Sequence, residues 1–346
     1  MGGAERLLVD IVKNLDRDNF SASVICLKRF GFWGMELKKQ GTPLFLAGWG
    51  KFFWLFGFLN LVKILKKEKP DIVHTHLFGA DVFGILAARL AGVKVIIATE
   101  HNLNYQEGFL KRFIKSWTMG FAQKIVAVSE AVRNYAVSSG RIPKEKIEII
   151  YNGVELEKFL NAERKYEKKN EIIVGSIGRL TEQKGFDFLI EAGALLKDEK
   201  INFFIAGEGK DRKKLEKQIK KGNLGDKIKL LGWQKDTKEF FDSLDIFVLP
   251  SRWEGFGIAI LEAGLAGLPV IASKVDGIKE IIQDNADGLL FEKGNVRELA
   301  EKINYLAGNP EEREKLAVNL RNKVKEKFSI EKIVREYENL YLRLLK

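Results

Sequence analysis

The sequence predicts an α/β protein made of two doubly wound domains, and three observations lead to that prediction. Short apolar runs rich in β-branched residues alternate with helical patterns along the chain, which is typical of βαβ units and parallel sheets. The length of 346 residues, 46% of them hydrophobic, provides enough apolar material for two ordinary cores. Near the middle of the chain the apolar periodicity stops and the charge density rises, which indicates a domain boundary.

Six strands are predicted on either side of this boundary. Those of the first half cover Ala22–Leu27, Pro43–Leu46, Ile72–Thr75, Val95–Thr99, Ile125–Val128 and Glu148–Tyr151. Those of the second half cover Ile172–Ser176, Asn202–Ala206, Ile228–Leu231, Ile246–Leu249, Val270–Ala272 and Gly288–Phe291. Their alternation with helical segments predicts one Rossmann-like sheet in each half.

The domain boundary is predicted in the segment that follows the sixth strand. We place the first domain at residues 1–153 and the second at 154–327, and we expect the polar stretch Asn161–Asn170 to belong to the boundary region. The last segment, 328–346, has apolar residues at helical spacing. We expect this helix to pack back on the first domain.

The N-terminus departs from the doubly wound pattern. In such a domain a glycine-rich turn follows a strand, but Gly2 and Gly3 follow only Met1. The first strand of the N-terminal domain is therefore missing from the sequence. Either the chain starts late, or the domain folds with a gap in its sheet.

Composition and charge exclude several classes of protein. The aromatic run Phe52–Val62 is too short to cross a bilayer, and Met1–Arg6 lacks the basic and apolar regions of a secretory signal. The single cysteine, Cys26, excludes an internal disulfide and indicates a reducing, cytoplasmic location. The net charge of +11 favours anionic partners without choosing among them. No nucleic-acid-binding module is recognisable, so no nucleic-acid partner is expected.

The segment Pro250–Ala263 has the strongest signs of chemistry. A strand ends there, turns through Gly255 and Gly257, and leads into a helix, so that backbone N–H groups and the helix dipole can receive an anion. Glu254 lies in the turn and Glu262 lies inside an otherwise apolar helix, where a carboxylate needs a partner. Sugar or ribose hydroxyls would provide such partners. The alternative is one exposed loop glutamate and one structural helix glutamate.

A second candidate site lies at residues 175–185, where another strand ends in a glycine-containing loop. Arg179 and Lys184 follow this strand, at the edge of a parallel sheet where α/β proteins bind ligands. Two positive charges at this edge could neutralise a diphosphate leaving group as its bond breaks. By themselves, an arginine and a lysine beside a turn are more often solvated surface residues.

Several of these motifs together resemble a known family. The spacing of Glu254 and Glu262 resembles the E-x7-E motif of retaining glycosyltransferases of the GT-B fold, in particular family 4. The same family has counterparts of Gly178-Arg179-Leu180, of Lys184-Gly185 and of the glycine loop that begins at Gly2. The resemblance extends over essentially the whole chain, and the motifs occur in the expected order.

The resemblance implies a donor site held between the two domains, with a nucleotide-diphosphate sugar as substrate and no cofactor or metal ion. It implies that Arg179 and Lys184 bind the diphosphate, that Glu254 contacts the transferred sugar, and that His101 lies beside it. It further implies that Glu262 contacts the ribose. The remaining donor-binding residues that it implies are Gly2, Gly3, Gly178, Gly207, Trp233, Phe256 and Gly257.

Metal binding by the other polar motifs is not favoured. His74 and His76 lack a cysteine or carboxylate companion at ligand spacing, and such pairs are more often structural. The Asp16–Asp18 motif follows a predicted surface helix rather than a buried strand.

The acceptor is expected to be a glycan or a lipid-linked molecule. The aromatic block Trp49–Phe58, with its lysine neighbours, could lie on an anionic membrane at its inner face, or it could be a buried helix of the first domain. Other functions remain open at this stage: a nucleotide-sugar epimerase of the same fold, a fragment with impaired catalysis because the first strand is absent, and a nucleic-acid-binding protein.

Overall fold

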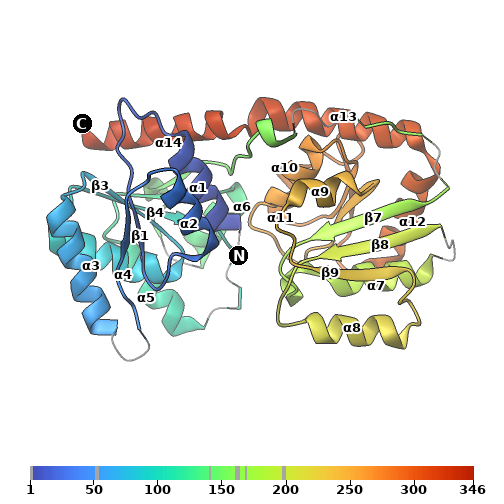
Figure 1. Cartoon of the computed structure of the whole chain (residues 1–346), viewed down its shortest axis with the longest axis horizontal. Helices are drawn as coiled ribbons and strands as arrows, with labels where there is room; N and C mark the ends of the chain where they lie inside the picture. The colour runs from blue at the N-terminus through green and yellow to red at the C-terminus, as the bar shows by residue number, and fades with distance from the viewer. Residues whose placement is uncertain are drawn as a thin grey trace. The chain divides into compact units, whose positions relative to one another are not determined.

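The computed structural model describes most of the chain and separates it into two compact units (Figure 1). Unit 1 comprises Met1–Gly153 and Ile330–Lys346, and unit 2 comprises Val154–Ser329. All twelve predicted strands are present, with ends that differ from the predicted ones by two residues or fewer. The described residues are 3–50, 54–103, 105–106, 108–139, 142–159, 164–167, 170–196 and 200–346.

Unit 2 contains one six-stranded parallel sheet in the order β9-β8-β7-β10-β11-β12. From the central strand β7 the chain adds strands outward to β9, and it then returns to place β10 on the other side of β7. The reversal makes the β7/β10 boundary a topological switch point, where doubly wound proteins bind ligands. The strands are β7 (Ile172–Ile177), β8 (Ile201–Ala206), β9 (Ile228–Gly232), β10 (Ile246–Leu249), β11 (Val270–Ser273) and β12 (Leu289–Phe291).

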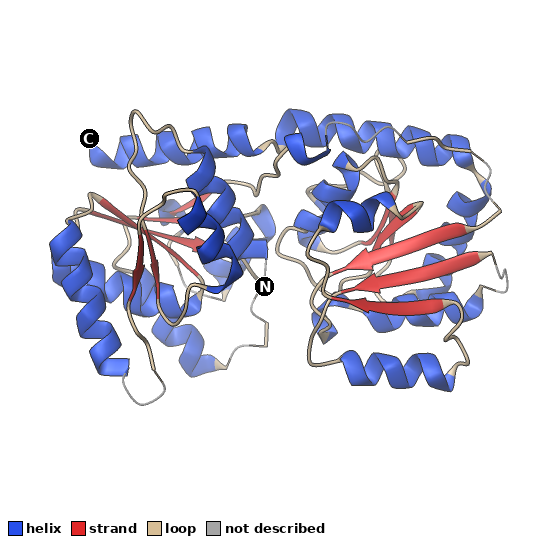
Figure 2. Cartoon of the chain, viewed as in Figure 1, coloured by secondary structure: helices blue, strands red, loops and turns tan. Residues whose placement is uncertain are grey.

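Helices cover both faces of this sheet, as Figure 2 shows. All four residues of β10, Ile-Phe-Val-Leu, are buried, which explains why the strand is apolar at every position instead of alternating. The helices of unit 2 are α7 (Phe186–Leu195), α8 (Arg212–Lys221), α9 (Thr237–Asp242), α10 (Ile258–Leu265), α11 (Asp276–Lys279), α12 (Val296–Gly308) and α13 (Pro310–Lys327).

Unit 1 contains two separate parallel sheets. One pairs β1 (Val24–Cys26) with β2 (Leu44–Leu46). The other has the order β3-β4-β5-β6, formed by β3 (Ile72–His76), β4 (Val95–Glu100), β5 (Lys124–Ala127) and β6 (Ile147–Ile149). Within the described residues no strand joins the two sheets.

The C-terminal helix belongs to the core of unit 1. The side chains of Tyr337 and Leu340 are buried in one cluster with Leu7 of the first helix and Ile97 of β4. The helices of unit 1 are α1 (Gly3–Asn14), α2 (Gly31–Lys39), α3 (Trp54–Glu68), α4 (Phe78–Ala91), α5 (Phe109–Met119), α6 (Glu130–Ser138) and α14 (Ile330–Leu345). None of the helices described here is long and apolar enough to span a bilayer.

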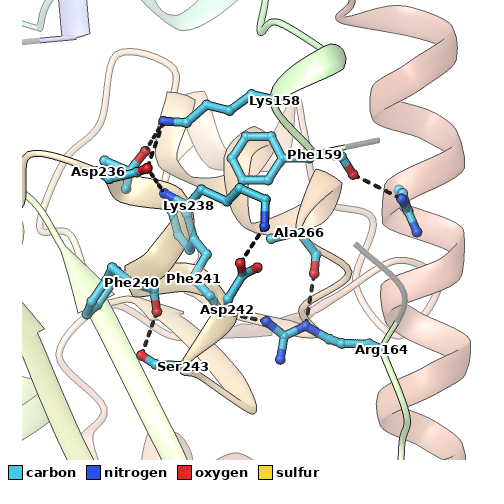
Figure 3. A network of polar contacts seen from close by, with 12 residues as sticks. Lys158, Phe159, Arg164, Asp236, Lys238, Phe240, Phe241, Asp242, Ser243 and Ala266 are labelled. Carbon is cyan, nitrogen blue, oxygen red and sulfur yellow. Dashed lines mark hydrogen bonds and ion pairs between the residues drawn. The ribbon is translucent and has the colours of Figure 1, made fainter. Parts of the chain in front are cut away.

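The described part of the stretch 161–170, which was predicted to belong to the boundary region, lies within unit 2 and packs against the rest of that unit. Arg164 donates hydrogen bonds to the carbonyls of Phe241, at 2.5 Å, and Ala266, at 2.9 Å, near the ends of α9 and α10 (Figure 3). The Tyr166 hydroxyl donates to the Gly267 carbonyl at 2.5 Å. Helix C-termini leave carbonyls without intrahelical partners, and these side chains supply donors, which the charge pattern alone could not reveal.

Candidate functional site

The candidate site of unit 2 is built from the turns that follow β7 and β10. The backbone N–H of Arg252 donates to the Gln183 carbonyl at 2.7 Å, and the Gln183 side chain donates to the Trp253 carbonyl at 3.2 Å. Gly185 completes the first turn in the left-handed region, with φ of 62°. The two turns are therefore joined by hydrogen bonds at the switch point of the sheet.

Lys184 and Glu254 form an ion pair across these two turns. The Lys184 ammonium nitrogen lies 2.6 Å from Glu254 Oε2, and the Ser251 hydroxyl donates to the same oxygen at 3.1 Å. The two charged side chains are only 18% and 10% exposed. Charges that are removed from water need partners in good geometry, and this pair provides them. The arrangement fixes the positions of a cation and a carboxylate at the ends of two parallel strands.

A second ion pair, which was not predicted from the sequence, reinforces the same turns. The Arg252 guanidinium makes two hydrogen bonds to the Asp187 carboxylate, at 2.7 and 2.6 Å, and lies 4.0 Å above the centre of the Phe188 ring. Burial opposes ionisation of Asp187, but its hydrogen bonds with Arg252 hold the pKa of Asp187 below its usual value. A bidentate arginine–carboxylate pair fixes orientation as well as position. In the sequence, Arg252 and Asp187 stand 65 positions apart and give no sign of their pairing.

Arg179 is not drawn into either ion pair. Its side chain is exposed and makes no ion pair with the described part of the chain, while its carbonyl accepts a hydrogen bond from the Thr181 N–H at 2.8 Å. The structure thus fixes the backbone of Arg179 and leaves its guanidinium accessible to an anion from solution.

Gly207 and Gly178 are required by close backbone contact. Gly207 has φ of 136°, and a Cβ atom added there would lie 1.8 Å from the Gly178 carbonyl oxygen. The Gly178 N–H donates to the Ala206 carbonyl at 3.0 Å, and a Cβ at Gly178 would lie 3.4 Å from the Lys184 side chain. The glycines therefore let the turns after β7 and β8 pack against each other beneath Lys184.

The turn after β10 leads directly into α10. Gly257, with φ of 103°, precedes the first residue of this helix, and the Phe256 side chain is buried against Phe328 with ring centres 5.6 Å apart. Glu262 lies in the second turn of α10 and is buried. The carboxylate predicted to need a partner therefore lies in the interior of the unit.

Thr237 approaches Glu262 and is itself contacted by Lys158, and neither residue was predicted from the sequence. The Thr237 hydroxyl lies 3.4 Å from Glu262 Oε1 and accepts a hydrogen bond from Lys158 Nζ at 2.8 Å. Lys158 also lies 3.6 Å from an Asp236 oxygen, and Figure 3 shows these two side chains together. The only sequence signal was the Asp236-Thr237 pair at the start of α9, which is typical of a helix N-cap.

Trp233 follows the end of β9 and is exposed. Gly232 turns the chain there with φ of 75°. Because the strands of this sheet are parallel, Trp233, Gly207 and Arg179 all follow strand ends at the same edge of the sheet.

His101 of unit 1 is buried and belongs to a group of three histidines, of which His74 and His76 are half-buried. It directly follows β4, and its Nε2 lies 3.0 Å from Nδ1 of His76. Both ring nitrogens of His74 are occupied, one by the Tyr341 hydroxyl and one by the Thr99 hydroxyl, each at 2.7 Å. The described residues include no cluster of three or more His, Cys, Asp or Glu side chains placed to hold a metal ion.

Burial keeps this histidine group neutral at physiological pH. It lowers the pKa of His76 from 6.5 to about 4. Burial, followed by the neighbouring His76 and Lys115, holds the pKa of His101 well below its usual range. A histidine with such a pKa acts through neutral hydrogen bonds rather than as a standing cation.

The glycine loop and the aromatic block of unit 1 are only partly described. Gly2 lies outside the described residues, and Gly3 is the exposed first residue of α1. In the block 49–58, Trp49 packs on Phe83 with ring centres 4.3 Å apart, whereas residues 51–53 lie outside the described part. The next side chains, Trp54, Leu55 and Phe56, are exposed. The block is therefore partly packed and partly exposed, and its predicted contact with a membrane remains a prediction.

The structure brings some of the predicted site residues together and leaves others apart. Lys184 and Glu254 are in direct contact, and Gly178 and Gly207 form the base of the same turns. Glu262 lies in the helix that follows, with Thr237 as its neighbour. The roles that the resemblance implies for these residues remain predictions.

Comparison with known proteins identifies the family. The family model described as Glycosyltransferase Family 4 matches residues 1–158, and that described as Glycosyl transferases group 1 matches residues 158–323. The UDP-Gal:alpha-D-GlcNAc-diphosphoundecaprenol alpha-1,3-galactosyltransferase of Escherichia coli is 32% identical, over 99% of this chain and 94% of that protein. The capsular polysaccharide biosynthesis glycosyltransferase CapM of Staphylococcus aureus is 27% identical, over 83% of this chain and 80% of its own.

Solved structures share the fold over nearly the full length. A glycosyltransferase from Rickettsia africae has a TM-score of 0.84 and 26% identity, covering 100% of this chain and 96% of its own. Anabaena Alr3699/HepE in complex with UDP-glucose has a TM-score of 0.87 and 24% identity, covering 98% and 96%. With motifs, family models and fold in agreement, the chain belongs to glycosyltransferase family 4 and is a glycosyltransferase of the GT-B fold.

Proposed function

We propose that this glycosyltransferase transfers a sugar from a nucleotide-diphosphate donor to a hydroxyl group of a glycan or lipid-linked acceptor, with retention of the anomeric configuration and without a metal ion. The observation that carries the proposal is the pair Lys184–Glu254 at the switch point of unit 2, with Ser251 bound to the same carboxylate. The relatives support the choice of substrates, because one is named for a UDP-sugar donor and a diphosphoundecaprenol-linked acceptor, and another was solved with UDP-glucose.

In this proposal the donor lies along the strand ends of unit 2. Arg179 and Lys184 bind the diphosphate, helped by backbone N–H groups of Phe256 and Gly257 at the start of α10. Glu254 accepts hydrogen bonds from hydroxyls of the transferred sugar, and Glu262 accepts them from the ribose. Gly178 permits close approach of the diphosphate, while Gly207 and Trp233 border the base.

The chemistry required of these residues is charge stabilisation. As the bond between the sugar and the diphosphate breaks, negative charge grows on the leaving group, and fixed cations lower the energy of that state. The acceptor hydroxyl attacks from the face that the diphosphate leaves, and its proton passes to the departing phosphate oxygen. No covalent enzyme intermediate is needed, since positioning of donor and acceptor supplies the remainder of the rate gain.

Three residues of unit 1 keep the roles that the family resemblance implies. His101 is proposed to lie beside the donor sugar as a neutral hydrogen-bonding group, consistent with its lowered pKa. Gly2 and Gly3 are proposed to contact the donor. We further propose that the enzyme acts in the cytoplasm at the inner face of the membrane, where a lipid-linked acceptor would be available.

A ligand screen tests the donor proposal directly. Thermal unfolding is measured with UDP, GDP, ADP and their sugars, because a ligand that binds the native state raises its apparent stability. We expect one nucleotide series to raise the melting temperature, and we expect Arg179→Ala to abolish most of that rise. Lys213→Ala, an exposed lysine on α8, is the matched control. The absence of stabilisation by any of these ligands would contradict the proposal.

Incubation of the stabilising NDP-sugar with the enzyme separates transfer from epimerisation. We expect no interconversion of donors in the absence of an acceptor. With an acceptor, NMR of the product should show the anomeric configuration of the donor, and a chelator should leave the rate unchanged. Inversion of that configuration, or inhibition by the chelator, would contradict the corresponding part of the proposal.

A further inference from the structure

Two histidines of unit 1 are not used in the proposed reaction, although they lie next to one that is. His74 and His76 are on β3, and His101 directly follows β4, the neighbouring parallel strand. Parallel strands end at the same edge of a sheet. His76, the last residue of β3, and His101 therefore both lie at the edge where doubly wound domains bind ligands.

The histidine contacts repeat along one face of the sheet. In the register of β3 and β4, His74 is opposite Ile97 and His76 is opposite Thr99. Each of these histidines contacts the side chain two positions beyond its register partner. His74 Nε2 lies 2.7 Å from the Thr99 hydroxyl, and His76 Nδ1 lies 3.0 Å from His101 Nε2. Side chains two positions apart share a face of the sheet, so the two diagonal contacts lie side by side.

The two contacts differ in what surrounds them. The other ring nitrogen of His74 lies 2.7 Å from the Tyr341 hydroxyl of α14, and the Tyr337 ring is 5.7 Å from the His74 ring. Both nitrogens of His74 are thereby occupied within the fold. In His101, by contrast, only Nε2 has a hydrogen-bond partner among the described residues. The second contact therefore leaves Nδ1 of a strand-end histidine for a ligand.

The contact between His76 and His101 selects a tautomer. A neutral imidazole has one nitrogen that donates and one that accepts. Burial lowers the pKa of both rings, so both are neutral, and a single N–H lies between the two nitrogens. If His76 donates this proton, Nδ1 of His101 carries a proton of its own, and if His101 donates it, Nδ1 is bare. The partner of one ring nitrogen thus decides what the other can do.

The backbone of His101 is held independently of His76. Glu100, the residue before it, is paired with Lys115 on the inward side of α5, opposite the exposed phenylalanines of that helix. The Glu100 carbonyl also accepts a hydrogen bond from the Val128 N–H at 3.3 Å. These contacts fix the main chain at the strand end but not the rotation of the imidazole about its Cβ–Cγ bond, which has a broad, nearly two-fold profile. The contact with His76 supplies that constraint.

We propose that His76 is a positioning residue, which holds the His101 ring in one orientation and one tautomer so that Nδ1 of His101 faces the donor sugar. The inference rests on the proposed function in one respect, because that function places His101 beside the transferred sugar. A sugar hydroxyl bonds to Nδ1, the nitrogen that His76 leaves accessible. Without His76 the ring can turn over and present a carbon atom in place of Nδ1, and the bond to the sugar is then lost in part of the enzyme molecules.

Nitrogen NMR of the histidine rings tests this positioning directly. The chain contains three histidines, so isotopically labelled histidine gives three ring spectra. We expect His101 to show a single neutral tautomer and a scalar coupling between its Nε2 and Nδ1 of His76. In His76→Leu the coupling should disappear, and the shifts of the His101 nitrogens should move toward the average of the two tautomers. Mixed tautomers of His101 in wild type, or an unchanged tautomer in His76→Leu, would overturn the proposal.

Turnover should depend on which atom replaces the ring nitrogen of His76. Asparagine carries its amide atoms on Cγ, as histidine carries Nδ1, whereas glutamine carries them one carbon further along. We expect His76→Asn to stay within about threefold of wild type, and His76→Gln and His76→Leu to lower kcat by about tenfold. Stabilisation by the free nucleoside diphosphate should be unchanged, since unit 2 is proposed to bind it. Turnover of His76→Asn as low as that of His76→Leu would contradict the positioning role.

A matched control removes a hydrogen bond from the same group without altering a contact of His101. Tyr341→Phe deletes the hydroxyl that contacts His74, so it should lower the melting temperature and leave turnover and the His101 tautomer unchanged. Because His76 acts through His101, adding His76→Leu to His101→Ala should cost no further turnover. An additive loss would overturn the proposal, as would a loss of turnover in Tyr341→Phe as large as that in His76→Leu.

Failure of this inference can be distinguished from failure of the proposed function, because the NMR measurement needs no substrate. A His101 tautomer that depends on His76, together with no stabilisation by any nucleotide sugar, would support the positioning of the ring and reject the donor assignment. Stabilisation by a nucleotide sugar, together with a tautomer that does not depend on His76, would retain the donor assignment and reject the positioning role.

Discussion

The two units solve the problem of burying polar groups at strand ends in different ways. Unit 2 uses ion pairs, Lys184–Glu254 and Arg252–Asp187, on turns that are held together by hydrogen bonds. In unit 1, the group around His101 consists of neutral histidines joined to one another and to hydroxyl groups. Unit 1 also has one buried ion pair, Lys115–Glu100, beside this group, whereas in unit 2 the ion pairs themselves form the turns where the diphosphate is proposed to bind. In the histidine group of unit 1, in contrast, burial lowers the pKa values and favours the uncharged form.

The largest expected difference between the units comes from a single methyl group. Gly207→Ala in unit 2 places a Cβ 1.8 Å from a backbone oxygen, and we expect it to lower the free energy of unfolding by more than about 4 kcal/mol. Gly92→Ala in unit 1 is the control, because it also has positive φ, 77°, but no atom within 4 Å. Gly92→Ala should lower the free energy of unfolding by about 1–2 kcal/mol. Urea unfolding measures both variants. A similar loss of stability in the two would show that the positive φ, rather than the close contact, determines the cost of the added methyl group.

Acidification should affect the units unequally, since all three histidines of the chain lie in unit 1. The folded-state pKa of His76 is lowered from 6.5 to about 4, so the unfolded chain binds more protons in this interval. Stability of unit 1 should therefore be fully present above pH 6.5 and decrease as the pH falls toward 4. The expected loss is about 3 kcal/mol, at about 1.4 kcal/mol per pKa unit.

Hydrogen exchange resolved by segment measures this effect. Amides of β3 and β4 should lose protection between pH 6.5 and 5 after correction for intrinsic exchange, while those of β7 and β10 should keep it. His76→Gln should reduce the change in amide protection of β3 and β4 with pH. A similar loss of protection in both units would mean that carboxylates, rather than the histidines, cause the pH dependence of stability.

The cations of unit 2 should have smaller but separable effects. We expect Arg179→Ala and Lys184→Ala each to lower turnover at least tenfold, equivalent to about 1.4 kcal/mol of transition-state stabilisation. Arg179→Ala should leave the melting temperature nearly unchanged, because its side chain makes no ion pair among the described residues. Lys184→Ala should also lower stability, because the Glu254 carboxylate loses its charged partner and keeps only the Ser251 hydroxyl. Equal rates for these variants and Lys213→Ala would reject the assignment.

The smallest predicted effect concerns the neighbours of Glu262. Thr237→Val removes the hydroxyl that accepts from Lys158 and approaches Glu262, and we expect about 1 kcal/mol of lost stability. Donor affinity should fall by less than it does for Glu262→Gln, since the proposal gives the ribose contact to the carboxylate. Titration calorimetry with the stabilising nucleotide compares the donor affinity of the two variants. A larger loss of affinity for Thr237→Val than for Glu262→Gln would assign the ribose contact to Thr237 instead of Glu262.

Strands and turns of this chain were predictable because they depend on local patterns. The apolar run Ile246–Leu249 and the glycines that follow it identify a buried parallel strand leading into a turn and a helix. The candidate residues Arg179, Lys184 and Glu254 were likewise recognisable from their position after such strands. The ion pair Arg252–Asp187 was not, because pairing across 65 positions leaves no periodicity to detect.

The sequence also failed to reveal how single side chains are oriented. The stretch around Arg164 has the composition of a linker, yet its guanidinium binds carbonyls at the ends of two helices. The pattern of α5 is amphipathic, but composition cannot tell which side faces the core. That choice depends on Glu100, which lies on a different element.

By itself, the sequence determined the fold class, the twelve strands, the glycine turns and the family, because each of these follows from short-range patterns or from the order of motifs. Only the tertiary structure decided which charges meet, which histidines are buried and which side of α5 is turned outward. The physical reason is that ion pairs, desolvation and exposure depend on groups brought together from distant parts of the chain, and their free energies exist only once the chain has folded.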